Sequence, residues 1–88
     1  MLIDVAYFAQ AAAATGTSEE SFEADELGGL LREIAARHGD AITELICDGS
    51  GTLVPWVLVD INGTLVRDQS HALAKGDRVR FISPISGG

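Results

Sequence analysis

One stretch of this chain limits the possible folds more than any other, because it carries an amphipathic helical stripe. Residues at i, i+3, i+4, i+7, i+8 and i+11 share one face of a helix, and here they are Leu27, Leu30, Leu31, Ile34, Ala35 and His38. Asp25 is expected to cap the first turn with its carboxylate, and Gly39 suits a left-handed C-cap. The spacing predicts one main helix over residues 26–38 with one buried face.

The rest of the chain is predicted to be mainly β-strand. Runs of β-forming residues between turn residues favour strands over 2–8, 18–24, 42–47, 53–61, 65–67 and 78–83. Short helical turns are expected over 9–14 and 70–73. Asn62-Gly63 lies between two apolar runs and is typical of a two-residue hairpin turn, in which both residues have positive φ.

The order of these segments predicts the architecture. A chain of 88 residues forms one domain, and one sheet against one helix is its simplest two-layer arrangement. We therefore expect an α+β fold, in which one mixed sheet of about five strands is covered by the main helix and the first and last strands are parallel. Residues 1–83 would form the domain, and residues 84–88 a flexible, protruding tail that ends in Gly87 and Gly88.

Charge and composition exclude several function classes. The net charge is −7, so nucleic acid is not an expected partner, because its phosphates repel an acidic chain. No apolar run reaches the roughly 20 residues that a membrane span requires. Cys47 is the only cysteine and there are two histidines, so neither an internal disulfide nor a metal site is expected. A lone cysteine, expected to be buried or inert, also fits a reducing, cytoplasmic location.

The last residues indicate a chemical role for the C-terminus. Pro84 ends the last strand, and Gly87 and Gly88 lack side chains, so they can enter a tunnel only as wide as a backbone. The reactive group of such an arm is the α-carboxylate of Gly88. A carboxylate becomes an electrophile only after its oxygen is made into a leaving group, as in adenylation. The alternatives are a frayed terminus and a remnant of cloning.

Six motifs are distributed over nearly the whole chain. They are Phe8-Ala9, Gly16, the helix of residues 25–39, residues 59–63, residues 75–79 and residues 81–88. Together they resemble the MoaD/ThiS family of ubiquitin-like, β-grasp sulfur carriers. The closing run, Phe-Ile-Ser-Pro-Ile-Ser-Gly-Gly, is most similar to the small subunit of molybdopterin synthase. Ser83 stands where that subunit often has proline, and residues 47–55 form a longer loop than the family has.

This resemblance implies a carrier whose Gly88 is adenylated by an E1-like adenylyltransferase that uses ATP and magnesium. Sulfur from a donor such as a cysteine desulfurase or rhodanese would convert the acyl-adenylate to a thiocarboxylate. The large subunit of molybdopterin synthase would use that sulfur to build the molybdopterin dithiolene, in molybdenum cofactor biosynthesis. The resemblance implies no bound cofactor, and it makes the chain a non-catalytic, sulfur-donating subunit.

The end of the last predicted strand supplies candidates for partner binding beside the glycines. The apolar and small residues among them are Phe81, Ile82, Pro84, Ile85 and Ser86. Alternation in this strand directs Phe81 to the side of Val79, so Phe81 fits core packing equally well. Arg78 and Arg80 either meet acidic groups on the adenylyltransferase or lie on a solvated face. Trp56 is expected to be half-buried, whereas an exposed Trp56 would mark a contact site.

Other functions remain compatible with the sequence. The same type of carrier serves thiamine, cysteine or tRNA thiolation, and a related type is a protein modifier joined to lysines. A plain interaction domain with an unused tail is the remaining alternative.

Overall fold

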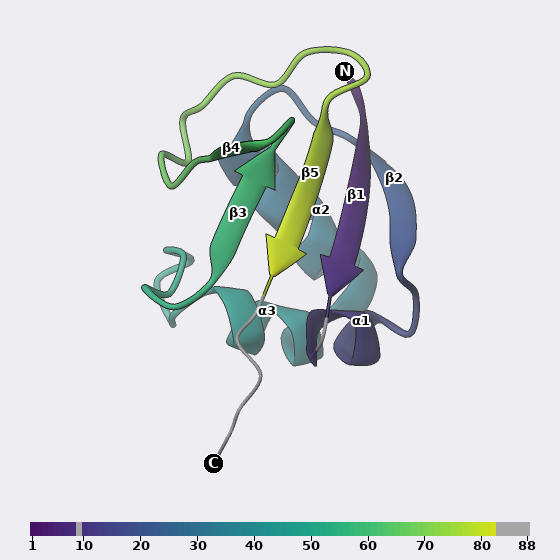
Figure 1. The fold of residues 1–88 in the computed structure, drawn as a ribbon. Coiled ribbons are helices and arrows are strands. Elements are labelled where there is room, and N and C mark those ends of the chain that lie inside the picture. Colours follow the sequence, from purple (N-terminus) through teal and green to yellow (C-terminus); the bar gives the residue numbers. More distant parts are fainter. Residues whose placement is uncertain (9, 83–88) are drawn as a thin grey trace.

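The computed structural model describes residues 1–8 and 10–82, and these form five strands and three helices. In chain order the elements are β1 (Leu2–Phe8), α1 (Gln10–Thr15), β2 (Glu19–Glu23), α2 (Leu27–His38), α3 (Asp40–Ile46), β3 (Leu58–Ile61), β4 (Thr64–Leu65) and β5 (Arg78–Ile82). The strand order in the sheet is β2-β1-β5-β3-β4 (Figure 1).

A parallel pair of strands, β1 and β5, forms the centre of the sheet, and the remaining pairings are antiparallel. α2 covers one face of the sheet, whereas α1 and α3 lie at the end where β1 and β5 finish (Figure 1). The predicted α+β fold, with a mixed five-stranded sheet and parallel first and last strands, is confirmed. Residues 84–88, predicted to be a tail, lie outside the described residues.

The core lies between α2 and the sheet. Alternation in the central strands buries Tyr7 of β1 and both Val79 and Phe81 of β5. The predicted helical stripe is confirmed, because its large members face this core: Leu27, Leu30, Leu31 and Ile34 are buried. Each such aliphatic side chain contributes about 1.5–3 kcal/mol by leaving water.

Residues 42–47 were predicted to be a strand, and this prediction is wrong, because residues 40–46 form α3. Ile42 and Ile46 are buried four residues apart, and Leu45 packs beside them. The i, i+3, i+4 spacing of Ile42, Leu45 and Ile46 is helical, although isoleucine by itself favours strands. The strand expected over 53–61 is also shorter, because only Leu58–Ile61 joins the ladder.

The start of α2 is capped differently from the expectation. Asp25 accepts a hydrogen bond from the amino group of Met1 at 3.2 Å, and the N-cap residue is Glu26, whose side chain makes no capping bond. Backbone carbonyls of a distant segment accept the first amides instead: Leu27 N–H bonds to His71 and Gly28 N–H to Gln69. The helical turn expected over 70–73 is therefore absent from this segment, which crosses the start of α2 and forms a bridge between Ala72 and Glu26.

The turn between β3 and β4 has the predicted conformation. Asn62 and Gly63 both have positive φ, at 53° and 91°, as a two-residue hairpin requires. Asp60 accepts the Gly63 N–H at 3.0 Å, and Asn62 donates to Asp77 at 2.8 Å. These bonds fix the turn against the start of β5. Within residues 1–8 and 10–82, no helix has both the length and the hydrophobicity that crossing a bilayer requires.

Candidate functional site

Three apolar side chains lie next to one another on the outer face of the sheet, which the helices do not cover. Phe8 of β1 and Leu58 of β3 both pair with Ile82 of β5, one on each side. Phe8 and Leu58 are 41% and 46% exposed, and Ile82 is half-buried. Their chain neighbours Tyr7 and Phe81 are buried on the opposite face, as strand alternation requires. We call Phe8, Ile82 and Leu58 the apolar row.

The apolar row lies at the end of the sheet where β1 and β5 finish (Figure 1). Ile82 directly precedes residues 83–88, which include Gly87 and Gly88. α1, with the sequence Gln-Ala-Ala-Ala-Ala-Thr, follows at the same end and has no charged residue. Adjacent exposed apolar side chains on a small protein mark an interaction surface, because water is a poor solvent for them. The apolar row is therefore a candidate docking surface beside the last residues.

Charged residues occupy the outer face farther from this end. Arg80 pairs with Asp60 of β3 through two contacts of 3.2 Å, one from Nε and one from Nη2. The Arg80 guanidinium and the Gly63 N–H together hold the pKa of Asp60 below its usual value. Arg78 forms an ion pair with Glu19 across β1. Both arginines thus have carboxylate partners within the chain itself.

Apart from Arg78 and Arg80, the site residues predicted from the sequence divide into three groups. Ile82 lies in the apolar row. Phe81 does not belong to a docking surface, because its side chain is fully buried and stacks on Tyr7 with the ring centroids 6.2 Å apart. The residues Pro84, Ile85, Ser86, Gly87 and Gly88 lie outside the described residues.

Sequence reasoning missed two members of the apolar row and mistook the environment of Trp56. Phe8 and Leu58 become neighbours of Ile82 only through the register of three strands, which no local pattern specifies. Strand alternation could have placed Phe8 outward, opposite to Tyr7. Trp56, expected to be half-buried, is 60% exposed.

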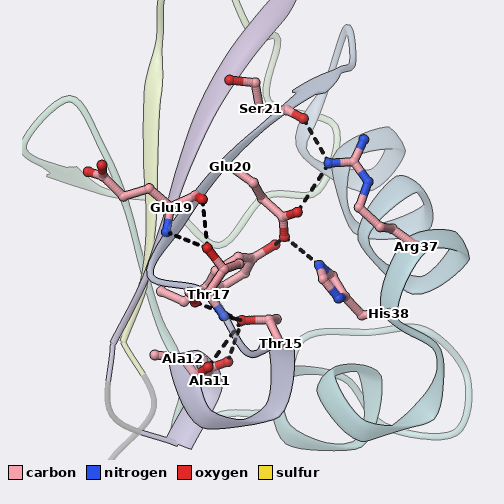
Figure 2. A network of polar contacts seen from close by, with 10 residues as sticks. Ala11, Ala12, Thr15, Thr17, Glu19, Glu20, Ser21, Arg37 and His38 are labelled. Atoms are coloured by element: carbon pink, nitrogen blue, oxygen red, sulfur yellow. Dashed lines mark hydrogen bonds and ion pairs between the residues drawn. The ribbon is translucent and has the colours of Figure 1, made fainter.

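A partly buried polar network ties β1, β2 and α2 together (Figure 2). Glu20 Oε2 accepts a hydrogen bond from the Tyr7 hydroxyl at 2.7 Å and lies 2.5 Å from His38 Nε2. Arg37 Nη1 donates to Glu20 Oε1 at 3.1 Å and to the Ser21 carbonyl at 3.0 Å. The residues are far apart in sequence, so only the fold reveals the network.

This network shifts the ionisation of two of its members. Burial and the Glu20 carboxylate raise the pKa of Tyr7, because both disfavour a phenolate. Burial also opposes the charge on Glu20, but hydrogen bonds from Tyr7, His38 and Arg37 outweigh it and lower the pKa of Glu20. The network is structural, since it stabilises one carboxylate. Tyr7, whose hydroxyl takes part in it, is only 2% exposed.

Cys47 is buried at the end of α3, as expected from the sequence. Burial, with the nearby Asp48 carboxylate, raises the pKa of its thiol, which disfavours the nucleophilic thiolate. Among residues 1–8 and 10–82, no three His, Cys, Asp or Glu residues gather in a way that could hold a metal ion.

Comparisons with known proteins agree with this geometry. Residues 5–88 match the model of the ThiS family. The comparison with curated proteins gives no match. Among solved structures, SAMP1 from Haloferax volcanii is 24% identical over 100% of both chains, with a TM-score of 0.89. A putative molybdopterin converting factor subunit 1 from Pyrococcus furiosus is 26% identical, with a TM-score of 0.77, over 97% of this chain and 99% of that chain.

A third structure is a complex of subunits 1 and 2 of molybdopterin-converting factor from Helicobacter pylori. It contains a chain 20% identical over 100% of both chains, with a TM-score of 0.64. These structural likenesses show the ubiquitin-like β-grasp fold, and the family match covers nearly the whole sequence. The chain therefore belongs to the ThiS family of ubiquitin-like sulfur carriers.

Proposed function

We propose that this chain carries sulfur as a thiocarboxylate on Gly88 and donates it for the molybdopterin dithiolene. The observation that carries the proposal is the position of the apolar row. Its middle residue, Ile82, is followed in the chain by six residues, of which the last two are Gly87 and Gly88. A partner that binds the row is therefore positioned to receive the last residues in its active site.

The chemistry requires two steps at Gly88. Its carboxylate attacks the α-phosphorus of ATP, which releases pyrophosphate and leaves an acyl-adenylate. A sulfur nucleophile then attacks the acyl carbon, the C–S bond forms, and AMP leaves. The adenylating enzyme supplies the ATP and magnesium, and neither step needs an acid or base from the carrier. The exposed charges of the carrier therefore serve recognition or solubility.

The two partners in this proposal are an adenylyltransferase and the large synthase subunit. The Helicobacter pylori structure supports a partner of the second kind, because its subunit 1 has the same fold as this chain. The similarity to subunit 1 from Pyrococcus furiosus favours the molybdopterin branch. The similarity to SAMP1 from Haloferax volcanii keeps protein modification as a second candidate.

Intact-mass spectrometry tests the proposal directly. The chain is incubated with the adenylyltransferase of its own organism, ATP, magnesium and inorganic sulfide, and a gain of about 16 Da is expected because sulfur replaces oxygen. The reaction without ATP is the control. Transfer of this sulfur to a pyranopterin precursor by the large subunit supports the molybdopterin branch. Covalent attachment of the chain to lysines of other proteins, without such transfer, would support a modifier instead.

A further inference from the structure

Trp56 is one of the two residues of a short turn, and the residues on either side of this turn are buried in the core. Val54 and Val57 are 5% and 0% exposed, and Val57 N–H bonds to the Val54 carbonyl at 3.4 Å across the turn. Between them, Pro55 is exposed and Trp56 is 60% exposed. The chain thus holds both sides of this turn firmly while it leaves its only tryptophan in water.

A single guanidinium fixes the backbone on both sides of Trp56. Arg67 Nη1 donates to the Val57 carbonyl at 2.9 Å, and Nη2 donates to the carbonyls of Val54 at 2.9 Å and Leu53 at 3.2 Å. Gln69 Oε1 accepts a further hydrogen bond from the Leu53 N–H at 3.0 Å. A side chain held in its exposed position before binding loses less entropy when a partner covers it.

The turn lies at the same end of the sheet as the apolar row. Leu58, two residues after Trp56, begins β3 and pairs with Ile82, the last residue of β5. Residues 83–88 span at most about 20–22 Å when fully extended. An enzyme that acts on the Gly88 carboxylate must therefore approach this end of the sheet closely.

At this end α3 presents the exposed acidic residues Asp40 and Glu44, whereas six other exposed residues there are uncharged. They come from the end of β1, from α1, from the turn and from the start of β3: Phe8, Gln10, Ala13, Pro55, Trp56 and Leu58. A partner surface that covers these six residues is therefore expected to be apolar. Tryptophan is also the residue type most enriched among side chains that dominate binding energy.

We propose that Trp56 is the anchor by which the adenylating enzyme selects this carrier, and that Arg67 is a positioning residue for it. In this proposal, Trp56 enters an apolar recess of the adenylating enzyme beside the channel that receives Gly88. The inference rests on the proposed function, since any use of the Gly88 carboxylate begins with its activation. It extends the apolar row by one aromatic side chain that lies outside the six motifs named in the sequence analysis.

Steady-state kinetics of ATP-dependent adenylation, followed as pyrophosphate release, tests the anchor. Trp56→Ala is expected to raise the KM for the carrier about 10- to 30-fold with little change in kcat. Arg67→Ala is expected to raise KM less, because the indole remains but its turn is loosened. Leu2→Ala is the matched control: Leu2 is 52% exposed at the opposite end of β1, so KM should not change. Thermal unfolding of each variant verifies that it is folded.

A second readout does not depend on turnover. Because Trp56 is the only tryptophan, 5-fluorotryptophan labels it alone, and its ¹⁹F resonance should shift when the enzyme binds. An unchanged KM for a folded Trp56→Ala variant, or an unshifted resonance with the enzyme bound, would overturn the anchor. A loss of kcat alone would do the same. If the wild-type chain is never adenylated, the proposed function itself fails, and these two failures are distinguishable.

Discussion

Phe81 and Ile82 are consecutive in β5 and have opposite surroundings. The Phe81 ring is fully buried against Tyr7, whereas Ile82 is half-buried on the outer face between Phe8 and Leu58. A core residue and a residue of the proposed docking surface are therefore separated by one peptide bond, directly before the last six residues. This separation makes both roles measurable with single substitutions.

Phe81→Ala is expected to lower the free energy of unfolding by about 3–5 kcal/mol, because it removes a fully buried ring from the core. Ile82→Asp is expected to leave most of that stability and to weaken binding to the adenylating enzyme, because it places a charge in the apolar row. Urea unfolding and the KM for the carrier give the two measurements. Equal effects of both substitutions on stability would contradict the assignment of the two faces.

Gly28 and Gly29 are neighbours in α2, and substitution by alanine is expected to change stability differently at the two positions. A Cβ on Gly28 would lie 3.1 Å from the Gln69 carbonyl oxygen, whose bond to the Gly28 N–H is only 2.7 Å long. The nearest atom to a Cβ on Gly29 is the flexible Arg32 Nη2, at 3.6 Å. Gly29→Ala should therefore stabilise the protein by about 0.5–1 kcal/mol through helix propensity.

Gly28→Ala should be less stable than Gly29→Ala, because the added methyl group pushes the crossing segment from the start of α2. Thermal unfolding of the two variants side by side provides the comparison. A Gly28→Ala variant that is as stable as Gly29→Ala would show that residues 69–71 yield without cost.

The Glu20 network predicts a loss of stability in acid. The pKa of Glu20 in the folded state is lowered by its hydrogen bonds to Tyr7, His38 and Arg37, against the opposing effect of burial. A group with a lowered folded pKa stabilises the fold above its ordinary pKa of 4.5 and loses this contribution as pH falls below it. The urea concentration at the midpoint of unfolding should therefore decrease as the pH is lowered from 6 to about 3.

Glu20→Gln should flatten this pH dependence and lower stability at pH 7 by about 1–3 kcal/mol, since it removes a charged acceptor. Glu33→Gln, at an exposed position on α2, is the matched control and should leave the pH profile unchanged. If the stability of both variants depends on pH as that of the wild type does, Glu20 is not responsible for the loss of stability in acid.

Changes at Gly88 are expected to abolish thiocarboxylate formation without lowering the stability of the fold. Gly88→Ala, or one residue added after Gly88, should abolish the gain of about 16 Da under the proposed chemistry, because a side chain or a displaced carboxylate no longer fits a backbone-wide channel. The melting temperature should stay within about 1 °C of the wild type, since no described core residue is altered. A marked drop in melting temperature would mean that this residue stabilises the domain.

The parts of the fold that local patterns encode could be predicted from the sequence. The stripe of α2 and the alternation of β5 each follow from one periodicity, and the turn at Asn62 and Gly63 follows from its backbone requirements. α3 was mistaken for a strand, because its seven residues are too short for periodicity to outweigh the preference of isoleucine for strands.

The candidate site could be predicted only in part. Ile82 was identified because it adjoins the tail in sequence. Phe8 and Leu58 reach it through parallel and antiparallel pairings, whose register depends on the whole sheet. The exposure of Trp56 depends on the three carbonyl contacts of Arg67, a residue eleven positions away.

The parallel pairing of β1 with β5 has a practical consequence for experiments on this protein. Because these strands run in the same direction, β1 begins at one end of the sheet and β5 finishes at the other, about 20 Å away. An affinity handle, dye or surface tether attached before Met1 would therefore leave the end of the sheet at which β5 finishes unobstructed. Immobilisation through the N-terminus presents every molecule with the apolar row directed away from the surface.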